Sequence, residues 1–395
     1  MRQLLLRSLF ACVLFVFAIG SAIGQVTTSS VQGIVSDGSG ETLPGANIVA
    51  VHEPSGTRYG AVSNLEGRFS LPNLRIGGPY TIQISFIGYR TQSYTGIILK
   101  LGEPYSLTVS LEDDSADLSE IVVTSSRTGD FTSSRTGAAT NISNEQVNAL
   151  PTISRSLTDF TRLTPQSNGN SFAGRDGRYN NVQIDGANFN NGFGLSDGLL
   201  PGGRSQPISL DAIQEITVNI APYDVRQSQF TGAGVNAVTR SGTNQFEGSA
   251  FGFFRNQDYS GRQVGDLELD EQNQASTRIM GFRLGGPIIK NKLFFFVNAE
   301  QTKNEGTNPG AVNLWRPSQD GIANPDNNIS RTRESDVIAV RDHLINTWNY
   351  NPGRYQGYAN DAGDESTSIF ARLDWNINEK HKFSARYSSV RGTRS

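Results

Sequence analysis

The stretch from Gly232 to Ser249, which reads G-A-G-V-N-A-V-T-R-S-G-T-N-Q-F-E-G-S, constrains the fold of this chain more than any other. Its first part alternates as a β-strand does up to Thr239, and the turn-forming run S-G-T-N follows. From Phe246 the alternation resumes with aromatic residues. The sequence before this stretch has the pattern of compact domains, and the sequence after it has the pattern of long hairpins.

Residues 1–24 have the layout of a secretory signal, with an arginine-containing start and an apolar run from Leu9 to Ile19. Small residues then precede a predicted cleavage at Gln25. The apolar run is too short for a membrane span of about twenty residues. The single cysteine, Cys12, lies inside this run. The secreted chain is therefore expected to be no lipoprotein and to have neither a disulfide nor a thiolate site.

The chain has 395 residues, enough for two or three domains, and a net charge of −3. No basic stripe stands out, so a nucleic-acid partner is not expected. The 42 glycines and the moderate charge favour β-rich structure with many turns.

Residues 25–112 are predicted to form a β-sandwich, because short strand patterns alternate with turn signals at intervals of roughly eight to twelve residues. Three motifs occur in order: G-x-V-x-D-x-x-G-x-x-L-P-G-A from Gly33, N-x-x-G-x-F from Asn64 and F-I-G-Y from Phe86. Together they resemble the carboxypeptidase regulatory-like domain, an Ig-like or transthyretin-like sandwich. That resemblance implies an accessory module without catalytic activity.

Residues 113–128 differ in character from the sandwich, since they begin with an acidic, flexible run. A short, β-branched run follows: Glu120, Ile121, Val122, Val123 and Thr124. Such a run between flexible flanks cannot bury itself and is available to pair with the edge of another sheet. The alternative is that it forms the last strand of the sandwich.

Residues 129–243 are predicted to form an α+β domain. A capping box precedes a short helix over Asn144–Leu150, and a second helix is expected over Ser156–Leu163. A strand ending in I-D-G is expected over Asn181–Gly186, and a helical turn followed by a strand over 208–218.

Residues 244–395 have the periodicity of β-hairpins with a short polar turn at 290–292 and another at 378–381. The segment 304–366 is expected to be a long polar loop. Short turns at one end and a long loop at the other are typical of transmembrane β-barrels. About five strands are predicted, whereas large outer-membrane transporters close with about twenty-two. The chain is therefore expected to be a fragment that could not transport by itself, because an open sheet leaves unpaired edges in lipid.

The order of these features resembles a TonB-dependent outer-membrane receptor of the Oar-like branch, which carries an extra N-terminal sandwich. On this resemblance residues 129–243 are the plug domain and residues 244–395 the N-terminal part of an incomplete transmembrane β-barrel. It implies location in the outer membrane, contact with membrane lipid, periplasmic N-terminal domains and an extracellular ligand that the sequence does not identify.

The same resemblance assigns roles to particular residues. The segment Glu120–Thr124 looks like a TonB box, which a receptor offers to its periplasmic energy-coupling partner TonB. The plug motif comprises Arg175, Asp185 and Gly186, and the plug–barrel junction comprises Arg240, Ser241, Gly242, Thr243 and Asn244. Arg175, Arg178, Asp185 and Arg204 are candidates for plug–barrel ion pairs or ligand contacts, the alternative being that they are solvated turn residues.

No catalytic, cofactor-binding or metal-binding residue is expected, and no cofactor. The three histidines, His52, His343 and His381, lie far apart and outside any metalloprotease motif, and no nucleophile elbow or phosphate loop is found. The run 232–237 satisfies G-x-G-x-x-A but continues as a strand, whereas a dinucleotide site needs a helix there. Two rival functions remain: a secreted or surface-anchored β-sandwich adhesin, and a carboxypeptidase suggested only by the accessory module.

Overall fold

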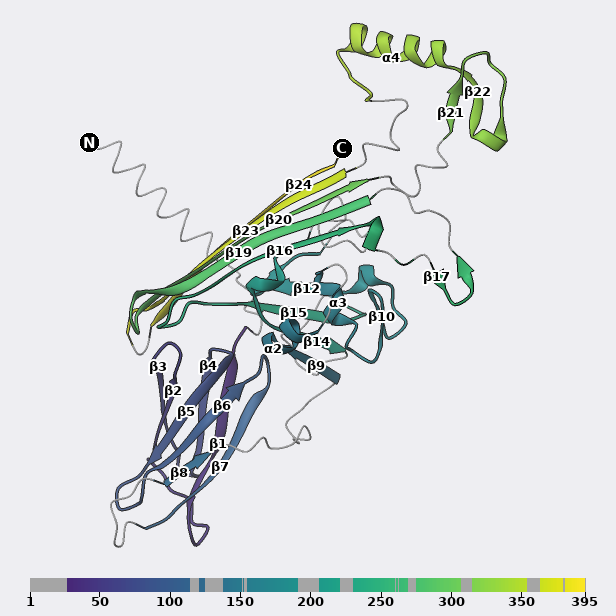
Figure 1. Ribbon diagram of the computed structural model, residues 1–395. Coiled ribbons are helices and arrows are strands. Elements are labelled where there is room, and N and C mark those ends of the chain that lie inside the picture. Colours follow the sequence, from purple (N-terminus) through teal and green to yellow (C-terminus); the bar gives the residue numbers. More distant parts are fainter. Residues whose placement is uncertain are drawn as a thin grey trace, which may run out of the picture.

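The computed structural model describes residues 27–113, 121–124, 138–150, 152, 155–190, 206–220, 230–259, 261, 263–268, 275–306, 315–353, 363–378 and 381–394. The predicted signal segment, residues 1–24, lies outside these ranges. Figure 1 shows a β-sandwich, a mixed domain and a sheet of long strands. The prediction of a mainly β fold is confirmed. Among the described residues no helix is long and apolar enough to cross a membrane.

The N-terminal sandwich consists of two sheets that enclose an apolar core. One sheet has the order β4-β1-β7 and the other the order β3-β2-β5-β6-β8. Alternate residues of the central strands are fully buried, among them Ile48, Ile82 and Ile84, as expected when one face of each sheet lies on a shared core. The strands are β1 Ser29–Asp37, β2 Asn47–His52, β3 Thr57–Val62, β4 Arg68–Leu74, β5 Gly77–Ser85, β6 Gln92–Leu99, β7 Pro104–Leu111 and β8 Ile121–Thr124.

The middle domain is built on a five-stranded sheet with the order β13-β12-β15-β14-β9. As predicted, helix α2 (Asn144–Ala149) starts with a capping box between Ser143 and Gln146, and helix α3 (Leu157–Thr161) follows. A 3-10 turn, η2 (Leu210–Ala212), leads into β14. The strands are β9 Ala138–Ser143, β12 Asn181–Ile184, β13 Ala187–Asn188, β14 Ile213–Ile220 and β15 Gly234–Thr239. The run 232–237 therefore continues as a strand, as expected.

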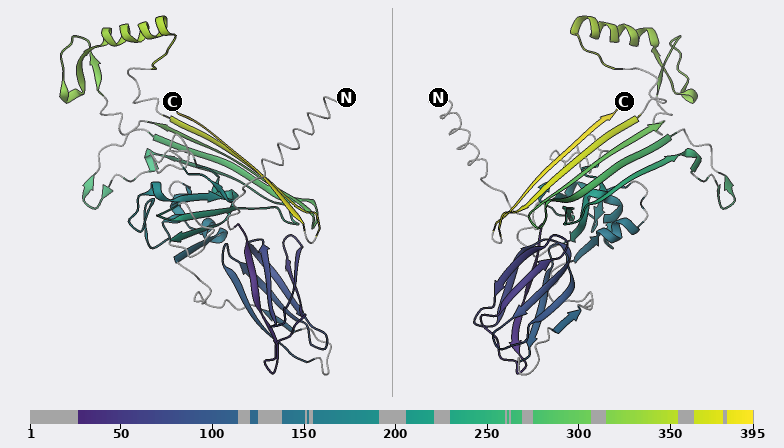
Figure 2. Two further views of the ribbon diagram at one scale, coloured as in Figure 1. Left: turned by 180° about the vertical axis from the view of Figure 1, so that it is seen from behind. Right: turned by 60° about the vertical axis from the view of Figure 1, so that its left-hand side comes forward.

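The third unit is an antiparallel sheet with the order β16-β19-β20-β23-β24, called here the long-strand sheet. Its strands are β16 Glu247–Asn256, β19 Ala275–Ile289, β20 Leu293–Gly306, β23 Gly363–Asn376 and β24 Lys382–Arg394. The register pairs β19 with β20 across the turn at residues 290–292, as predicted. Figures 1 and 2 show the middle domain lying against one face of this sheet.

The two faces of the long-strand sheet differ in chemistry. Phe294, Phe296 and Glu300 on β20 are buried. Phe296 belongs to the same apolar cluster as the middle-domain core, and Glu300 accepts a hydrogen bond from the Ser209 hydroxyl of that domain. The opposite face leaves large apolar side chains exposed on neighbouring strands, among them Phe282, Leu284, Ile369, Trp375 and Tyr387. Alternation with a two-residue period produces this division because successive strand side chains point to opposite faces.

The prediction of a long polar loop over residues 304–366 is wrong in part. Strand β20 extends to Gly306 and β23 starts at Gly363, and the segment between them includes a 15-residue helix, α4 (Glu334–Trp348). Two short strands, β21 (Arg316–Ser318) and β22 (Ile329–Arg333), pair beside it. No residue of α4 is buried. Val337, Val340, Leu344 and Trp348 nevertheless recur at helical spacing, a signal of this helix that the loop prediction overlooked. Its ends are marked only by acidic residues in the first turn and by Asn349 in the left-handed conformation.

Candidate functional site

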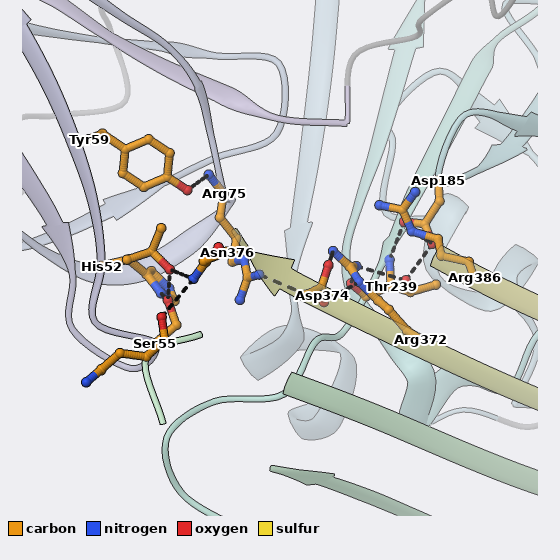
Figure 3. Close-up of polar contacts among 12 residues, drawn as sticks. His52, Ser55, Tyr59, Arg75, Asp185, Thr239, Arg372, Asp374, Asn376 and Arg386 are labelled. Atoms are coloured by element: carbon orange, nitrogen blue, oxygen red, sulfur yellow. Dashed lines mark hydrogen bonds and ion pairs between the residues drawn. The ribbon is translucent and has the colours of Figure 1, made fainter. Parts of the chain in front are cut away.

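A cluster of charged and polar residues, buried or partly buried, lies where the three units meet, and it is called the three-way junction (Figure 3). The middle domain supplies Asp185 and Thr239, the long-strand sheet supplies Arg372, Asp374 and Arg386, and the sandwich supplies Arg75.

Asp185 connects the middle domain to the long-strand sheet. It follows β12 with φ of 50° and is succeeded by Gly186 with φ of 84°, a conformation that short polar residues and glycine tolerate. One carboxylate oxygen accepts a hydrogen bond from the Thr239 backbone N–H at 2.9 Å, and the other from the Thr239 hydroxyl. The Arg386 Nε lies 3.1 Å from the same carboxylate, whose side chain is only 5% exposed. The turn at the end of β12 thus holds the end of β15 and a strand of the other sheet together.

Arg372 attaches the same strand end from the other side. Its guanidinium donates two hydrogen bonds to Asp374, at 2.8 and 3.1 Å, and donates a third to the Thr239 carbonyl at 2.7 Å. Arg372 and Asp374 are two residues apart on β23, so both face the middle domain. Their side chains are 8% and 7% exposed. A bidentate arginine–carboxylate pair removed from water holds its geometry firmly, so Thr239 is fixed to the sheet through its carbonyl.

The sandwich reaches this cluster through Arg75, whose Nη2 lies 3.8 Å from the Asp374 carboxylate. The Tyr80 hydroxyl donates to the Arg75 carbonyl at 2.7 Å, and the Arg75 N–H donates to the Tyr59 hydroxyl at 3.3 Å. The Lys382 ammonium lies 3.1 Å from the centroid of the Tyr59 ring. Two tyrosines of the sandwich therefore hold the backbone of the arginine, and one of them, Tyr59, contacts a lysine of the long-strand sheet.

A hydrogen-bonded row continues from His52 toward the sheet. The His52 Nδ1 and the Ser55 hydroxyl are 2.7 Å apart, the hydroxyls of Ser55 and Thr57 are 2.7 Å apart, and the Asn376 amide donates to Thr57 at 3.0 Å. Burial lowers the pKa of His52 to about 3, and the positive charge of Arg75 acts in the same direction. The imidazole is therefore neutral at physiological pH, and its role here is structural.

The segment Arg240–Asn244, predicted as a junction, passes between all three units. Arg240 donates its N–H to the Ala212 carbonyl at 2.8 Å. A Cβ at Gly242 would overlap the backbone oxygens of Phe295 and Gly286, so only glycine fits this close approach. Ser241 is half-buried. Thr243 accepts from the Gln245 N–H, and Asn244 donates its own N–H to the Pro54 carbonyl of the sandwich at 2.8 Å.

A second contact joins the sandwich to the middle domain around Glu215. The Leu101 N–H donates to its carboxylate at 2.9 Å, and Ile76, Leu101 and Val238 form a small apolar cluster. Burial raises the pKa of Glu215 to about 7, because little water is left to solvate the charge. A carboxyl that titrates near neutrality therefore lies at the contact between the two units.

The structure separates the predicted site residues. Of the three charged candidates that the structure describes, Asp185 alone reaches the three-way junction. Arg175 is exposed in a turn, and Arg178 pairs with the exposed Asp176 at 2.9 Å. Arg204 lies outside the described residues.

The segment that resembles a TonB box is described from Ile121 to Thr124 as strand β8, which pairs in parallel with β6, and Glu120 lies outside the described residues. This pairing corresponds to the alternative in which the segment is a strand of the sandwich sheet. β8 is the last strand in its sheet.

The sequence analysis did not identify Arg75, Arg372, Asp374 and Arg386 as site residues. The last three occupy polar positions of alternating strands, and such positions point toward the interior of a transmembrane barrel. Charges there are a usable signal, but the partner of each charge comes from another unit. No group of three or more histidine, cysteine or acidic residues that could hold a metal ion occurs in the part of the chain that the structure describes.

The sandwich and the long-strand sheet each match a known family of domains. Residues 30–112 match the carboxypeptidase regulatory-like domain, and residues 238–395 match the outer membrane beta barrel domain. The chain is a homologue of the TonB-dependent transporter Oar of Myxococcus xanthus, with 24% identity over 341 residues that cover 82% of this chain.

A shorter match links the chain to the TonB-dependent receptor SusC of Bacteroides thetaiotaomicron, with 36% identity over 94 residues, or 24% of this chain. The matched regions cover 30% of Oar and 8% of SusC. Among solved structures, the siderophore receptor PirA of Acinetobacter baumannii aligns with 66% of this chain and 32% of its own, at 18% identity and a TM-score of 0.41.

Replacement of Asp185 by alanine is expected to loosen the middle domain from the sheet. Arg386 and the two Thr239 donors lose their acceptor. A buried donor left unsatisfied costs about 1–3 kcal/mol, whereas Arg386, whose side chain is 30% exposed, keeps contact with water. Tryptic cleavage of the middle domain should accelerate accordingly. The matched control is Asp176→Ala, since Asp176 and Arg178 are about half exposed and such pairs contribute little. Equal resistance of the two variants to trypsin would contradict the role of Asp185 in attaching the middle domain to the sheet.

Glu215→Gln tests the carboxyl between the sandwich and the middle domain. Because the pKa of Glu215 is raised in the folded protein, the parent should lose stability as pH rises from about 4.5 to about 7. The glutamine keeps the acceptor for Leu101 and should be more stable than the parent by about 3 kcal/mol at pH 8, with no difference at pH 4. Urea titrations at both pH values measure this, with the exposed Glu66→Gln as control. A parent whose stability does not fall with pH would refute it.

Proposed function

We propose that this chain forms the sandwich, the plug and barrel strands of a TonB-dependent outer-membrane receptor. In it, residues 138–239 are the plug and the long-strand sheet is barrel wall. The observation that carries the proposal is the attachment of the plug to the inner face of this sheet through Asp185, Thr239 and Arg372, while the outer face is apolar and exposed. A lipid-facing wall that holds a polar domain inside fits a gated transporter.

The chemistry of the two faces and the homology to Oar favour a receptor over a secreted adhesin. An adhesin needs neither an apolar outer surface nor buried ion pairs behind it. The relatives are named as a transporter and a receptor, which likewise argues against a carboxypeptidase. In this proposal the protein binds a ligand and moves it without covalent chemistry on the substrate.

In the proposed mechanism an extracellular ligand binds where plug and barrel meet, and TonB then engages the segment Glu120–Thr124 in the periplasm. Strand addition supplies main-chain hydrogen bonds for this contact. The order of the plug sheet suggests how force would act. Strand β9 is an edge strand, and its first residue, Ala138, is paired with Ile220 at one end of the ladder. A pull applied at Ala138 would open this ladder one pair at a time.

The other side of the plug is held more firmly. Strand β15 lies between β12 and β14, and its last residue, Thr239, is attached to Asp185 and Arg372. The force would therefore move β9 and α2 before it moves β12 and β15. In this arrangement the three-way junction keeps one side of the plug on the barrel wall while the other side opens a path.

Val122→Pro tests the assignment of the TonB box. Proline removes a backbone donor that strand pairing needs. The variant should lose energised uptake and bind the periplasmic domain of the host TonB at least tenfold more weakly in outer-membrane extracts, while surface binding of the ligand persists. The control Val122→Thr keeps the donor and a β-branched side chain and should behave as the parent does. Undiminished TonB binding by the proline variant would refute the assignment of this segment as a TonB box.

A further inference from the structure

The edge of the sandwich next to the box carries a further inference, which rests on the proposed function. Strand β8 (Ile121–Thr124) pairs in parallel with the first half of β6, with Gln92 opposite Ile121 and Thr95 opposite Thr124. In the sheet order β3-β2-β5-β6-β8 it is the terminal member. One edge of β8 is therefore paired with the sandwich, and its other edge has no strand beside it among the described residues.

We propose that the sandwich presents this segment to TonB as a preformed edge strand, so that an extended segment of the periplasmic domain of TonB adds to β8 as the next strand of the sandwich sheet. The docking site is then β6 and β8 together, and β8 does not leave β6 when the partner binds. The accessory domain in this way becomes half of the docking site.

The position of β8 suits a partner that approaches from the side away from the barrel. The box pairs with Gln92–Thr95, whereas the other end of β6 leads to Leu101, which contacts Glu215 of the plug. Figures 1 and 2 show β8 on the part of the sandwich that points away from the long-strand sheet.

The opposite end of the sandwich is attached, so the platform has a fixed orientation. Arg75 contacts Asp374, Thr57 accepts from Asn376, and the Pro54 carbonyl accepts from Asn244. A partner strand that meets β8 finds the backbone already extended and held on a sheet that does not rotate freely. Part of the ordering entropy of strand addition is thereby removed before binding.

The register of β6 offers a way to weaken the β8 pairing alone. On the β5 side the pairing runs from Ile82–Tyr94 to Tyr80–Ile97, with an irregularity between them. Thr95 therefore has no paired residue on β5, although it pairs with Thr124 on β8. Proline is tolerated at such irregular positions. Thr95→Pro should loosen β8 while the pairing of β5 with β6 persists.

A disulfide between β6 and β8 can test whether β8 stays on β6 when TonB binds or has to leave it. Ser93 lies opposite Val122, and paired positions of neighbouring strands fall within the Cα separation that a disulfide requires. The single natural cysteine, Cys12, precedes the predicted cleavage site. The double variant Ser93→Cys, Val122→Cys is oxidised in native outer-membrane extracts, and its affinity for the purified periplasmic domain of the host TonB is measured before and after reduction. Each single-cysteine variant serves as a control.

If the sandwich presents β8 to TonB, the oxidised double-cysteine variant should bind TonB as tightly as its reduced form or more tightly. The Thr95→Pro variant should bind TonB at least tenfold more weakly than Thr95→Val. A tenfold loss on oxidation that reductant reverses would overturn the proposal, because TonB would then have to remove β8 from β6. If Thr95→Pro fails to fold, as judged by tryptic protection of the sandwich, the disulfide experiment alone tests the proposal. A wrong assignment of Glu120–Thr124 as the TonB box is recognised separately, since Val122→Pro would then bind TonB as the parent does.

Discussion

The buried contact of Asp185 with Thr239 and Arg386 is the interaction on which the rest of this structure depends. A carboxylate removed from water needs several donors, and this one has two from Thr239 and a guanidinium from the long-strand sheet. Arg372 attaches the same strand end through its carbonyl. Because these partners belong to different units, the charges are satisfied only when the middle domain lies against the sheet in one register. The ion pairs thus specify position, which is the best-supported role of buried charges.

The sandwich shares in this arrangement through contacts that differ in kind. Arg75 adds its charge to Asp374, while Leu101 and Ile76 add a backbone donor and apolar area around Glu215 and Val238. The contact of Arg75 stabilises the negative charge of Asp374. The contact around Glu215 disfavours a negative charge, since burial raises the pKa of Glu215 to about 7. The sandwich is therefore coupled both to the middle domain and to the long-strand sheet.

Much of the fold could be predicted from residue patterns because the relevant forces are local. The capping box at Ser143, the turn at Gly186 and the hairpin turn at 290–292 each follow from a few neighbouring residues. Helix α4 was missed although Val337, Val340 and Leu344 recur at helical spacing, because its polar flanks favoured a loop and no tertiary contact buries the helix. Of the charged residues proposed for the site, Asp185 lies in it and Arg175 is exposed in a turn. The two differ in their surroundings, which the residue type does not encode.

The sequence by itself determined where the sandwich pattern gives way to the mixed domain and then to long alternating strands, and which positions along those strands are apolar or polar. It did so because a two-residue period and turn chemistry act over short stretches of chain. Only the tertiary structure decided that Arg372 faces Thr239, that Arg75 reaches Asp374, and that Ile121–Thr124 lies beside β6. These pairings join residues far apart in the chain, and each depends on how whole sheets pack against one another, which local patterns do not specify.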